Sequence, residues 1–217
     1  LIEGEVKTVP TFAYSVLNHY IRGSVYGDSK TPETVLIETQ SGLYYIAGKE
    51  NNPKFNDFLF ELYDRSKTKK LRFTLFSSTE HWDEVIKKQL NKQVRRYSFE
   101  FHDHNQYHDH DMNLLAGDYC IKRINEELIT KSLEFNEDYY KEYWGSLSNF
   151  IENGFGYCIL HEGKVISECT SIFSSPQFAE IDIATHKDYR GQGLATTISR
   201  IFIKHCLEND IMPRWDC

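Results

Sequence analysis

The residues with the clearest capacity for chemistry lie in residues 180–195, where carboxylates, an arginine and two glycines follow one another closely. Over the first half of this stretch polar residues alternate with mostly apolar ones, which predicts a half-buried strand. Ile181 and Ile183 then share one face, and the other face carries Glu180, Asp182 and Ala184. A carboxylate on such a face can accept a proton from a reacting group. This strand is therefore a candidate for general base chemistry.

The second half of the stretch predicts an anion-binding turn. Gly191 and Gly193 allow a tight turn with exposed backbone N–H groups, and apolar residues from Leu194 to Cys206 then recur at helical spacing. A helix N-terminus opens at such a turn, where unpaired N–H groups and the positive end of the helix dipole favour a phosphate. Arg190 adds a positive charge beside it. Glycine turns of this kind also occur for structural reasons alone, so the wider context decides.

The wider context resembles one enzyme superfamily. Arg190-Gly-Gln-Gly-Leu-Ala195 matches the pattern R/Q-x-x-G-x-G/A, and with the strand end Ile183-Ala-Thr185 it resembles the acetyl-CoA-binding core of the GNAT N-acetyltransferases. It fits neither common nucleotide fingerprint, because no Lys-Ser/Thr follows the second glycine and the glycine spacing differs from that of a dinucleotide turn. The resemblance covers about residues 118–217, where the expected order of elements also agrees with the family.

The resemblance implies where acetyl-CoA, the co-substrate, binds. Its pyrophosphate is expected on the backbone N–H groups of Arg190, Gly191, Gln192, Gly193, Leu194, Ala195 and Thr196. Its pantetheine arm is expected to pair with backbone groups of Ile183, Ala184 and Thr185 as though it were another strand. Going back along the chain from Tyr189 to Asp182 covers roughly 23 Å at the rise of a strand, which is long enough for the extended arm.

The chemistry that follows is direct transfer to an amine, with no acyl-enzyme. A backbone N–H of the strand stabilises the oxyanion, and a carboxylate removes the proton of the attacking ammonium. Glu180 is the preferred candidate base, with Asp182 and Glu168 as alternatives, although acidic residues on half-exposed strands are often only solvated. Trp144 lies in the segment that covers the acceptor pocket in the family, so it is a candidate for substrate binding, although aromatic residues at helical spacing are more often core.

The elements expected around this site form an α+β domain over residues 118–217. The resemblance implies a GNAT fold with a mixed, mostly antiparallel sheet flanked by helices. The patterns predict strands at 118–124, 156–160, 164–173, 180–186 and from Pro213, with helices at 125–128, 137–152 and 194–209. The family continues with a further helix and strands, and that helix often carries the tyrosine that protonates the leaving thiolate. We therefore expect either an incomplete chain or a sheet completed by another chain, as in a homodimer.

Residues 1–101 predict a separate N-terminal α+β domain. Helices are expected at 11–20, around 55–62 and at 79–90, a hairpin at 34–38 and 43–47, and strands at 71–76 and 94–101. No cluster of reactive residue types appears in this part of the sequence. Its role stays open between a structural, a substrate-shaping and an oligomeric one.

Residues 102–117 are expected to link the two domains, because this polar segment follows neither the helical nor the strand period. Imidazoles mixed with carboxylates can bind a transition metal, which leaves a metal-sensing alternative through His102, His104, His108 and His110. Structural zinc sites, however, usually take their ligands from spaced pairs on ordered turns. We therefore expect no bound metal.

Composition sets broader limits. The chain has 217 residues, 40% of them hydrophobic, which is enough for a core, and a net charge of −7 argues against a general nucleic-acid-binding surface. The five cysteines are widely spaced without a C-x-x-C pair, which favours reduced thiols. No membrane-spanning run and no signal peptide are recognisable, so a cytoplasmic location is expected, although Leu1 in place of Met weakens the second point.

The resulting hypothesis is an N-acetyltransferase that acts on a primary amine of a small molecule or peptide in a ternary complex. The alternative is a non-catalytic acyl-CoA-binding regulatory module that keeps the loop without turnover. The sequence does not identify the acceptor.

Overall fold

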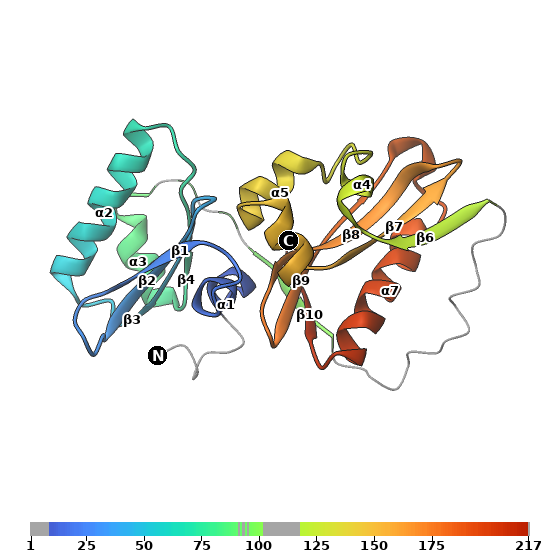
Figure 1. Cartoon of the computed structure of the whole chain (residues 1–217). Helices are drawn as coiled ribbons and strands as arrows, with labels where there is room; N and C mark the ends of the chain where they lie inside the picture. Colours follow the sequence, from blue (N-terminus) through green and yellow to red (C-terminus); the bar gives the residue numbers. More distant parts are fainter. Residues whose placement is uncertain (1–8, 91, 93, 95, 102–117, 217) are drawn as a thin grey trace. The chain divides into compact units, whose positions relative to one another are not determined.

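The computed structural model describes residues 9–90, 92, 94, 96–101 and 118–216. The chain divides into two compact units, residues 1–95 and 96–217, each with its own sheet (Figure 1). The His-rich segment and its candidate metal ligands lie outside the described residues.

The N-terminal unit is built on a four-stranded sheet in the order β1-β2-β3-β4. The strands β1, β2 and β3 are antiparallel neighbours, whereas β4 runs parallel to β3 and is reached through the helix α2. The α2 helix begins at Pro53, and the side chain of Asn52 caps it by accepting a hydrogen bond from Phe55 N. The elements are α1 (Thr11–Leu17), β1 (Gly23–Gly27), β2 (Thr34–Thr39), β3 (Leu43–Gly48), α2 (Pro53–Thr68), β4 (Thr74–Ser77) and α3 (Glu80–Lys87).

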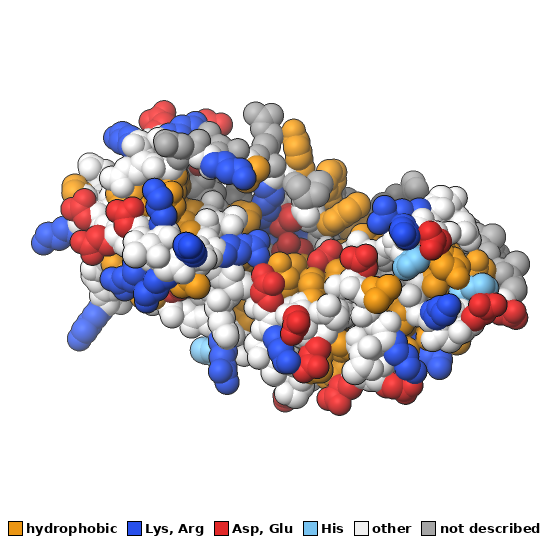
Figure 2. All heavy atoms as spheres, turned by 90° about the horizontal axis from the view of Figure 1, so that it is seen from above, with side chains coloured by type: hydrophobic (Ala, Val, Ile, Leu, Met, Phe, Trp, Pro, Cys, Tyr) orange, Lys and Arg blue, Asp and Glu red, His pale blue; other side chains and the backbone are white. Residues whose placement is uncertain are grey.

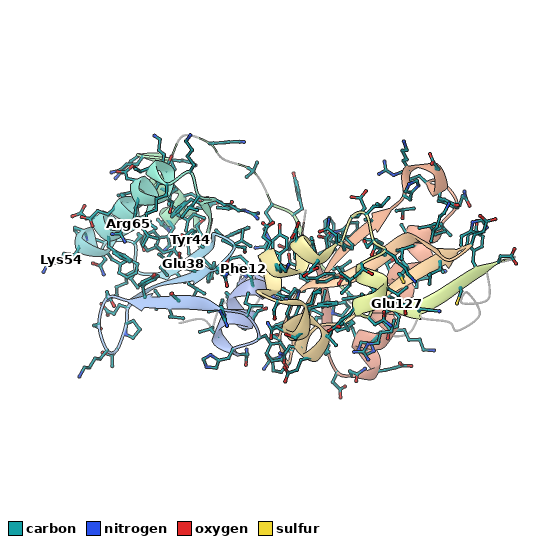
Figure 3. The ribbon with its side chains drawn as sticks, turned by 45° about the horizontal axis from the view of Figure 1, so that its top comes forward. Phe12, Glu38, Tyr44, Lys54, Arg65 and Glu127 are labelled. Atoms are coloured by element: carbon teal, nitrogen blue, oxygen red, sulfur yellow. The ribbon has the colours of Figure 1, made fainter. Side chains whose placement is uncertain are left out.

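One face of this sheet packs against α2 and α3. The buried side chains between them are Leu36, Tyr44, Ile46, Phe55, Leu59, Leu62, Trp82 and Ile86. Beside this core the Glu38 carboxylate accepts hydrogen bonds from the hydroxyls of Tyr26 (2.7 Å) and Tyr44 (2.8 Å). Figure 3 labels Glu38 and Tyr44 together with Arg65 of α2. Burial and the bonded carboxylate raise the pKa of Tyr44 to about 12, so its hydroxyl remains a donor.

The C-terminal unit contains a six-stranded sheet in the order β5-β10-β9-β8-β7-β6. The strands β6 to β9 are antiparallel neighbours, β10 runs parallel to β9, and β5 is antiparallel to β10. This mixed, mostly antiparallel sheet with helices on both faces confirms the expected fold. The elements are β5 (Ser98–Glu100), β6 (Tyr119–Arg123), α4 (Glu126–Ile129), α5 (Glu137–Trp144), α6 (Leu147–Asn153), β7 (Gly156–His161), β8 (Lys164–Ser174), β9 (Phe178–Thr185), α7 (Leu194–Glu208) and β10 (Met212–Asp216).

The alternation along β9 decides which helices each residue meets. Ala179, Ile181 and Ile183 face α7, which lies along the strands and contributes Leu194, Ile198, Phe202 and Cys206 to a common core (Figure 1). The opposite face of the sheet packs against α5 and α6. There the Tyr140 hydroxyl donates to Thr170 Oγ1 (3.2 Å), and the Trp144 indole N–H donates to Ser171 O (3.1 Å). The predicted division of β9 into an apolar face and a carboxylate face is confirmed.

Three local expectations were wrong. The single helix over residues 137–152 is two helices, because Gly145 ends α5 in a left-handed conformation (φ 78°) and Ser146 caps α6 by accepting from Asn149 N. The strand β1 was not expected, since its two glycines and single valine give no clear strand pattern. The strand expected at residues 94–101 is only Ser98–Glu100, and it pairs with β10 in the C-terminal sheet.

The surface carries charges of both signs. On the face shown in Figure 2, Lys and Arg side chains are interspersed with Asp and Glu side chains over each unit. Among the described cysteines, Cys158, Cys169 and Cys206 are buried and Cys120 is exposed. Burial raises the pKa of the Cys158 and Cys206 thiols to about 12, which makes them unreactive at neutral pH. None of the helices in the described residues is both long and apolar enough to cross a membrane.

Candidate active site

The strand β9 is paired fully on one side and only at its start on the other. It pairs with β8 from Ala179 to Thr185, but its pairing with β10 ends where Glu180 meets Arg214. Beyond that point β10 pairs with β5 instead. Within the described residues no strand pairs with residues 181–185 on that side. We call this stretch the open edge of β9; its backbone N–H and C=O groups can bond an extended ligand.

The loop after β9 leads from the open edge to the N-terminus of α7. A single turn of 3₁₀ helix (Lys187–Tyr189) is followed by Arg190, whose Nε donates to Thr185 O (3.1 Å) at the end of the strand. Gly191 and Gly193 have φ of 78° and 77°, a left-handed conformation that favours glycine. A Cβ at either glycine would meet no atom within 4 Å, so the loop faces open space.

Gly193 is also the N-cap of α7, and no side chain caps the helix there. The first N–H groups of an α-helix have no partner within the helix, so those of α7 point outward from this loop. Ala195 and Thr196 in the first turn are exposed. The loop therefore has the backbone and the positive helix end that bind phosphate.

Ring side chains of β6, β7 and the loop itself contact the loop that follows β9. The Tyr119 hydroxyl donates to Gln192 Oε1 (3.1 Å), and the Tyr119 ring lies 4.8 Å from the His161 ring, centroid to centroid. His161 Nδ1 in turn lies 3.2 Å from the Tyr189 hydroxyl. These contacts join the loop to the far strands of the sheet, and sequence reasoning missed them.

Asp182 lies beside the open edge on the face that meets α5. Its Oδ2 accepts a hydrogen bond from the Tyr139 hydroxyl (2.9 Å), and its Oδ1 accepts one from the N–H of Ile183 (2.9 Å). Burial raises the pKa of Asp182, and these two hydrogen bonds partly offset the rise. Burial, with the negative charge of Asp182, also raises the pKa of Tyr139 well above its usual value, so this hydroxyl stays protonated.

Glu168 is on the same face, opposite Ala184 in the neighbouring strand, and is only 5% exposed. Its Oε1 accepts a hydrogen bond from the Ser132 hydroxyl (2.5 Å), and Ser132 Oγ accepts one from Phe135 N (2.9 Å). Burial raises the pKa of Glu168 to about 7, against the lowering effect of Ser132 and of the Phe135 N–H. A carboxyl group that titrates near neutrality suits proton transfer.

The other two predicted residues lie in different surroundings. Glu180 shares the face of Asp182 and is half-buried at the point where β9 and β10 separate. Trp144, the candidate for substrate binding, is 1% exposed and packs edge-on against Phe150. An acceptor could touch its side chain only after the surrounding core had moved.

The structure thus brings the three carboxylates to one face of the sheet and adds two partners, Tyr139 and Ser132. Tyr139 belongs to an aromatic run on α5, and nothing in the spacing distinguishes it from its core neighbour Tyr140. Beside Glu168 the surface forms a shallow depression, lined by Leu133, Glu134, Val165, Ile166, Glu168, Ala184 and His186.

Comparison with known protein families decides the assignment. The family model described as GNAT acetyltransferase matches residues 3–217. The chain belongs to this family. Because the match includes both units, the family likeness extends through the N-terminal unit, beyond the residues 118–217 that resemble the GNAT core by motif.

Individual relatives agree. The uncharacterized N-acetyltransferase YdfB of Bacillus subtilis (strain 168) is 44% identical over 215 residues, which is 97% of this chain and 81% of that protein. A GCN5-related N-acetyltransferase-like protein from Streptococcus suis 89/1591 is similar in structure, with a TM-score of 0.65, 25% identity, and coverage of 90% of this chain and 78% of that one. A GCN5-related N-acetyltransferase from Kribbella flavida shares the fold, with a TM-score of 0.56, 12% identity, and coverage of 95% and 84%.

The chain is therefore an acetyltransferase of the GNAT family, whose members use acetyl-CoA as co-substrate and act on amine acceptors. The expected family and fold are confirmed.

Proposed function

We propose that this GNAT acetyltransferase transfers the acetyl group of acetyl-CoA to a primary amine of a small molecule or peptide, by direct attack in a ternary complex. One observation carries the proposal: the open edge of β9 runs into a helix N-terminus that no side chain caps. An extended amide chain that ends in a pyrophosphate matches both parts of this surface.

In this proposal the loop from Arg190 to Thr196 binds the pyrophosphate, and backbone groups of Ile183, Ala184 and Thr185 pair with the pantetheine arm. The Ile183 N–H, which donates to Asp182 Oδ1 in the present structure, is the candidate donor to the thioester oxygen. The amine nitrogen attacks the carbonyl carbon, the nitrogen gives up a second proton as the C–S bond breaks, and the departing thiolate takes up a proton, so that coenzyme A leaves as the thiol.

The attacking amine must first lose a proton, and we propose Asp182 as its acceptor. Asp182 lies at the open edge and is partly exposed, whereas Glu168 is almost fully buried. Glu180, one alternation step earlier on the same face, and Glu168 remain the alternative bases. The three carboxylates, with the exposed Glu134 near Glu168, favour an acceptor that approaches as a cation.

The proposed coenzyme site is tested by Gly193→Val, with Gly163→Val as a matched control. Both glycines have a left-handed φ (77° and 76°) and open space around the missing Cβ, so the two substitutions carry similar backbone strain. Calorimetry with acetyl-CoA should show binding lost in Gly193→Val and kept in Gly163→Val. Normal binding by folded Gly193→Val would show that the phosphate loop is misassigned.

Turnover separates the enzyme from a regulatory acyl-CoA-binding module. Asp182→Asn should bind acetyl-CoA with little change and lose roughly 10²–10⁴-fold in kcat, the contribution of a general base. Release of coenzyme A thiol over a panel of polyamines, aminoglycosides, amino acids and peptides identifies the acceptor. Because Cys120 is exposed, the assay should use a Cys120→Ser background. No turnover with any amine would favour the module.

A further inference from the structure

The N-terminal unit repeats the strand order of the C-terminal unit. In both, two antiparallel neighbours lead to a third strand, a helix crosses over, and a fourth strand lies parallel to the third. The strands β1, β2, β3 and β4 thus correspond to β7, β8, β9 and β10 in order and in direction.

The helices agree as well. The crossover helix α2 has 16 residues and α7 has 15, and each packs one stripe of buried residues onto its sheet. That stripe is Phe55, Leu59, Leu62 and Ser66 in α2, and Leu194, Ile198, Phe202 and Cys206 in α7. A seven-residue helix also precedes the first strand of each set, α1 before β1 and α6 before β7. Such agreement in sequence order, strand direction and the place of the crossover helix points to one architecture used twice.

The two units differ where the C-terminal one would hold pyrophosphate. The connection from β3 to α2 is residues 49–52, against residues 186–193 between β9 and α7. It lacks the glycine pattern, and it starts α2 with the capping side chain of Asn52 and with Pro53, which has no N–H. In α2, Asn52 accepts from one N–H group of the first turn and Pro53 has no N–H group to offer. Fewer N–H groups are therefore left for a phosphate than at the N-terminus of α7, where no side chain caps the helix at Gly193.

The units also differ along the strand that would pair with pantetheine. In the N-terminal unit β4 follows β3 up to Ile46, where Ser78 N donates to Ile46 O (3.1 Å). Two residues further, the Trp82 indole N–H donates to Gly48 O (3.0 Å), the last carbonyl of the strand. Trp82 is fully buried. The edge of β3 that corresponds to the open edge of β9 is thus hydrogen-bonded by the backbone of β4 and Ser78 and by the indole of Trp82.

We infer that the N-terminal unit is a second GNAT-type unit whose coenzyme slot is filled by Trp82 and closed at its phosphate end by Asn52, so that each chain binds one acetyl-CoA. The stoichiometry of one acetyl-CoA per chain rests on the proposed function of the C-terminal unit. The closure itself does not, because it depends only on contacts within the N-terminal unit.

Hydrogen exchange on the intact chain, with and without coenzyme A, tests the stoichiometry. Protection should appear in peptides that cover residues 181–196 and be absent from peptides that cover residues 46–56, with calorimetry giving one equivalent per chain. Two equivalents, or protection at residues 46–56, would overturn the inference while leaving the proposed site in place. If coenzyme A protected no peptide from exchange, the proposed function would be contradicted. The closed slot in the N-terminal unit would then be tested by exchange of the Trp82 indole N–H.

The closed slot is tested without coenzyme by exchange of the indole N–H groups, followed by NMR. The Trp82 indole N–H should exchange roughly 100-fold or more slowly than that of Trp215, as expected for a bonded group released only by larger openings. Trp215 is 48% exposed and serves as the fast reference, and Trp144, bonded to Ser171 O, serves as the slow one. Trp215→Phe and Trp144→Phe assign the signals. Exchange of Trp82 as fast as that of Trp215 would show that the slot is not filled.

Discussion

Asp182 and Tyr139 form the pair on which the proposed proton transfer depends. The Tyr139 hydroxyl donates to the Asp182 carboxylate, so it favours the ionised form and lowers a pKa that burial raises. The carboxylate must be ionised to act as a base. In the proposed mechanism Tyr139 therefore extends activity to lower pH than burial of Asp182 alone would allow.

Tyr139→Phe should shift the acidic limb of the kcat/KM profile to higher pH, because loss of the donor raises the pKa of Asp182. Activity should fall most at low pH and recover as the pH rises. Tyr140→Phe is the matched control: it is the next residue on α5 and also loses a hydroxyl donor, but that hydroxyl bonds Thr170. An unshifted limb in Tyr139→Phe would exclude Asp182 as the titrating base.

Glu168 makes folding stability depend on pH. Its pKa is about 7 in the folded chain against an ordinary value of 4.5, so the folded state holds the proton more tightly than the unfolded chain. Stability therefore falls as the pH rises from about 4.5 to about 7, and the loss from this one group amounts to about 3 kcal/mol.

Glu168→Gln should abolish that part of the slope in urea unfolding measured between pH 5 and pH 8. The amide keeps an acceptor for Ser132 and carries no charge to desolvate. The exposed Glu152 provides the control, since Glu152→Gln should leave the slope unchanged. A wild-type slope in Glu168→Gln would mean that this carboxylate is not desolvated in the folded chain.

Among the helices, the break between α5 and α6 distinguishes the structure from the pattern in the sequence. A single helix over residues 137–152 would place Gly145 in its interior, where alanine is favoured by about 1 kcal/mol. The structure places Gly145 at a helix end in a left-handed conformation, where alanine is disfavoured by about 1–2 kcal/mol.

Gly145→Ala should therefore lower the free energy of unfolding by about 1–2 kcal/mol rather than raise it. Urea unfolding of the purified variant measures the sign directly. The same change at Gly163, also at positive φ and with open surroundings, should cost a similar amount. If Gly145→Ala stabilised the protein, Gly145 would lie inside a single helix and not at a helix end.

The strand β9 and the helix α7 were predictable because each has a local period and a glycine turn between them. The open edge was implied only by the family resemblance, because it depends on where β10 leaves β9, and no local pattern encodes the separation of two strands far apart in sequence. The same reason hid the Ser132 contact of Glu168, which bridges residues 36 apart. The short β1 and β5 gave weak patterns and take their place from their neighbours.

Acetyl-CoA bound as proposed should stabilise the protein, because such a ligand binds the folded state and not the unfolded chain. At a concentration 100 times the Kd it should add about 2.7 kcal/mol to the stability of the unit that binds it. Scanning calorimetry should show a rise of about 10 °C for that unit's transition, since 1 kcal/mol shifts the midpoint of a unit of about 120 residues by about 4 °C. The Gly193→Val variant should show none. A rise in the transition of the N-terminal unit alone would reassign the binding site.

The open edge of β9 also affects how readily the protein self-associates when no coenzyme is bound. An unpaired strand edge is a template on which another chain can add a strand, and natural sheets usually block such edges with charge, proline or a covering loop. Over residues 181–185 the sequence Ile-Asp-Ile-Ala-Thr offers a single charge, at Asp182. Coenzyme bound as proposed would cover this edge, so the coenzyme-free protein should self-associate more readily than the loaded protein, which light scattering with and without coenzyme A would measure.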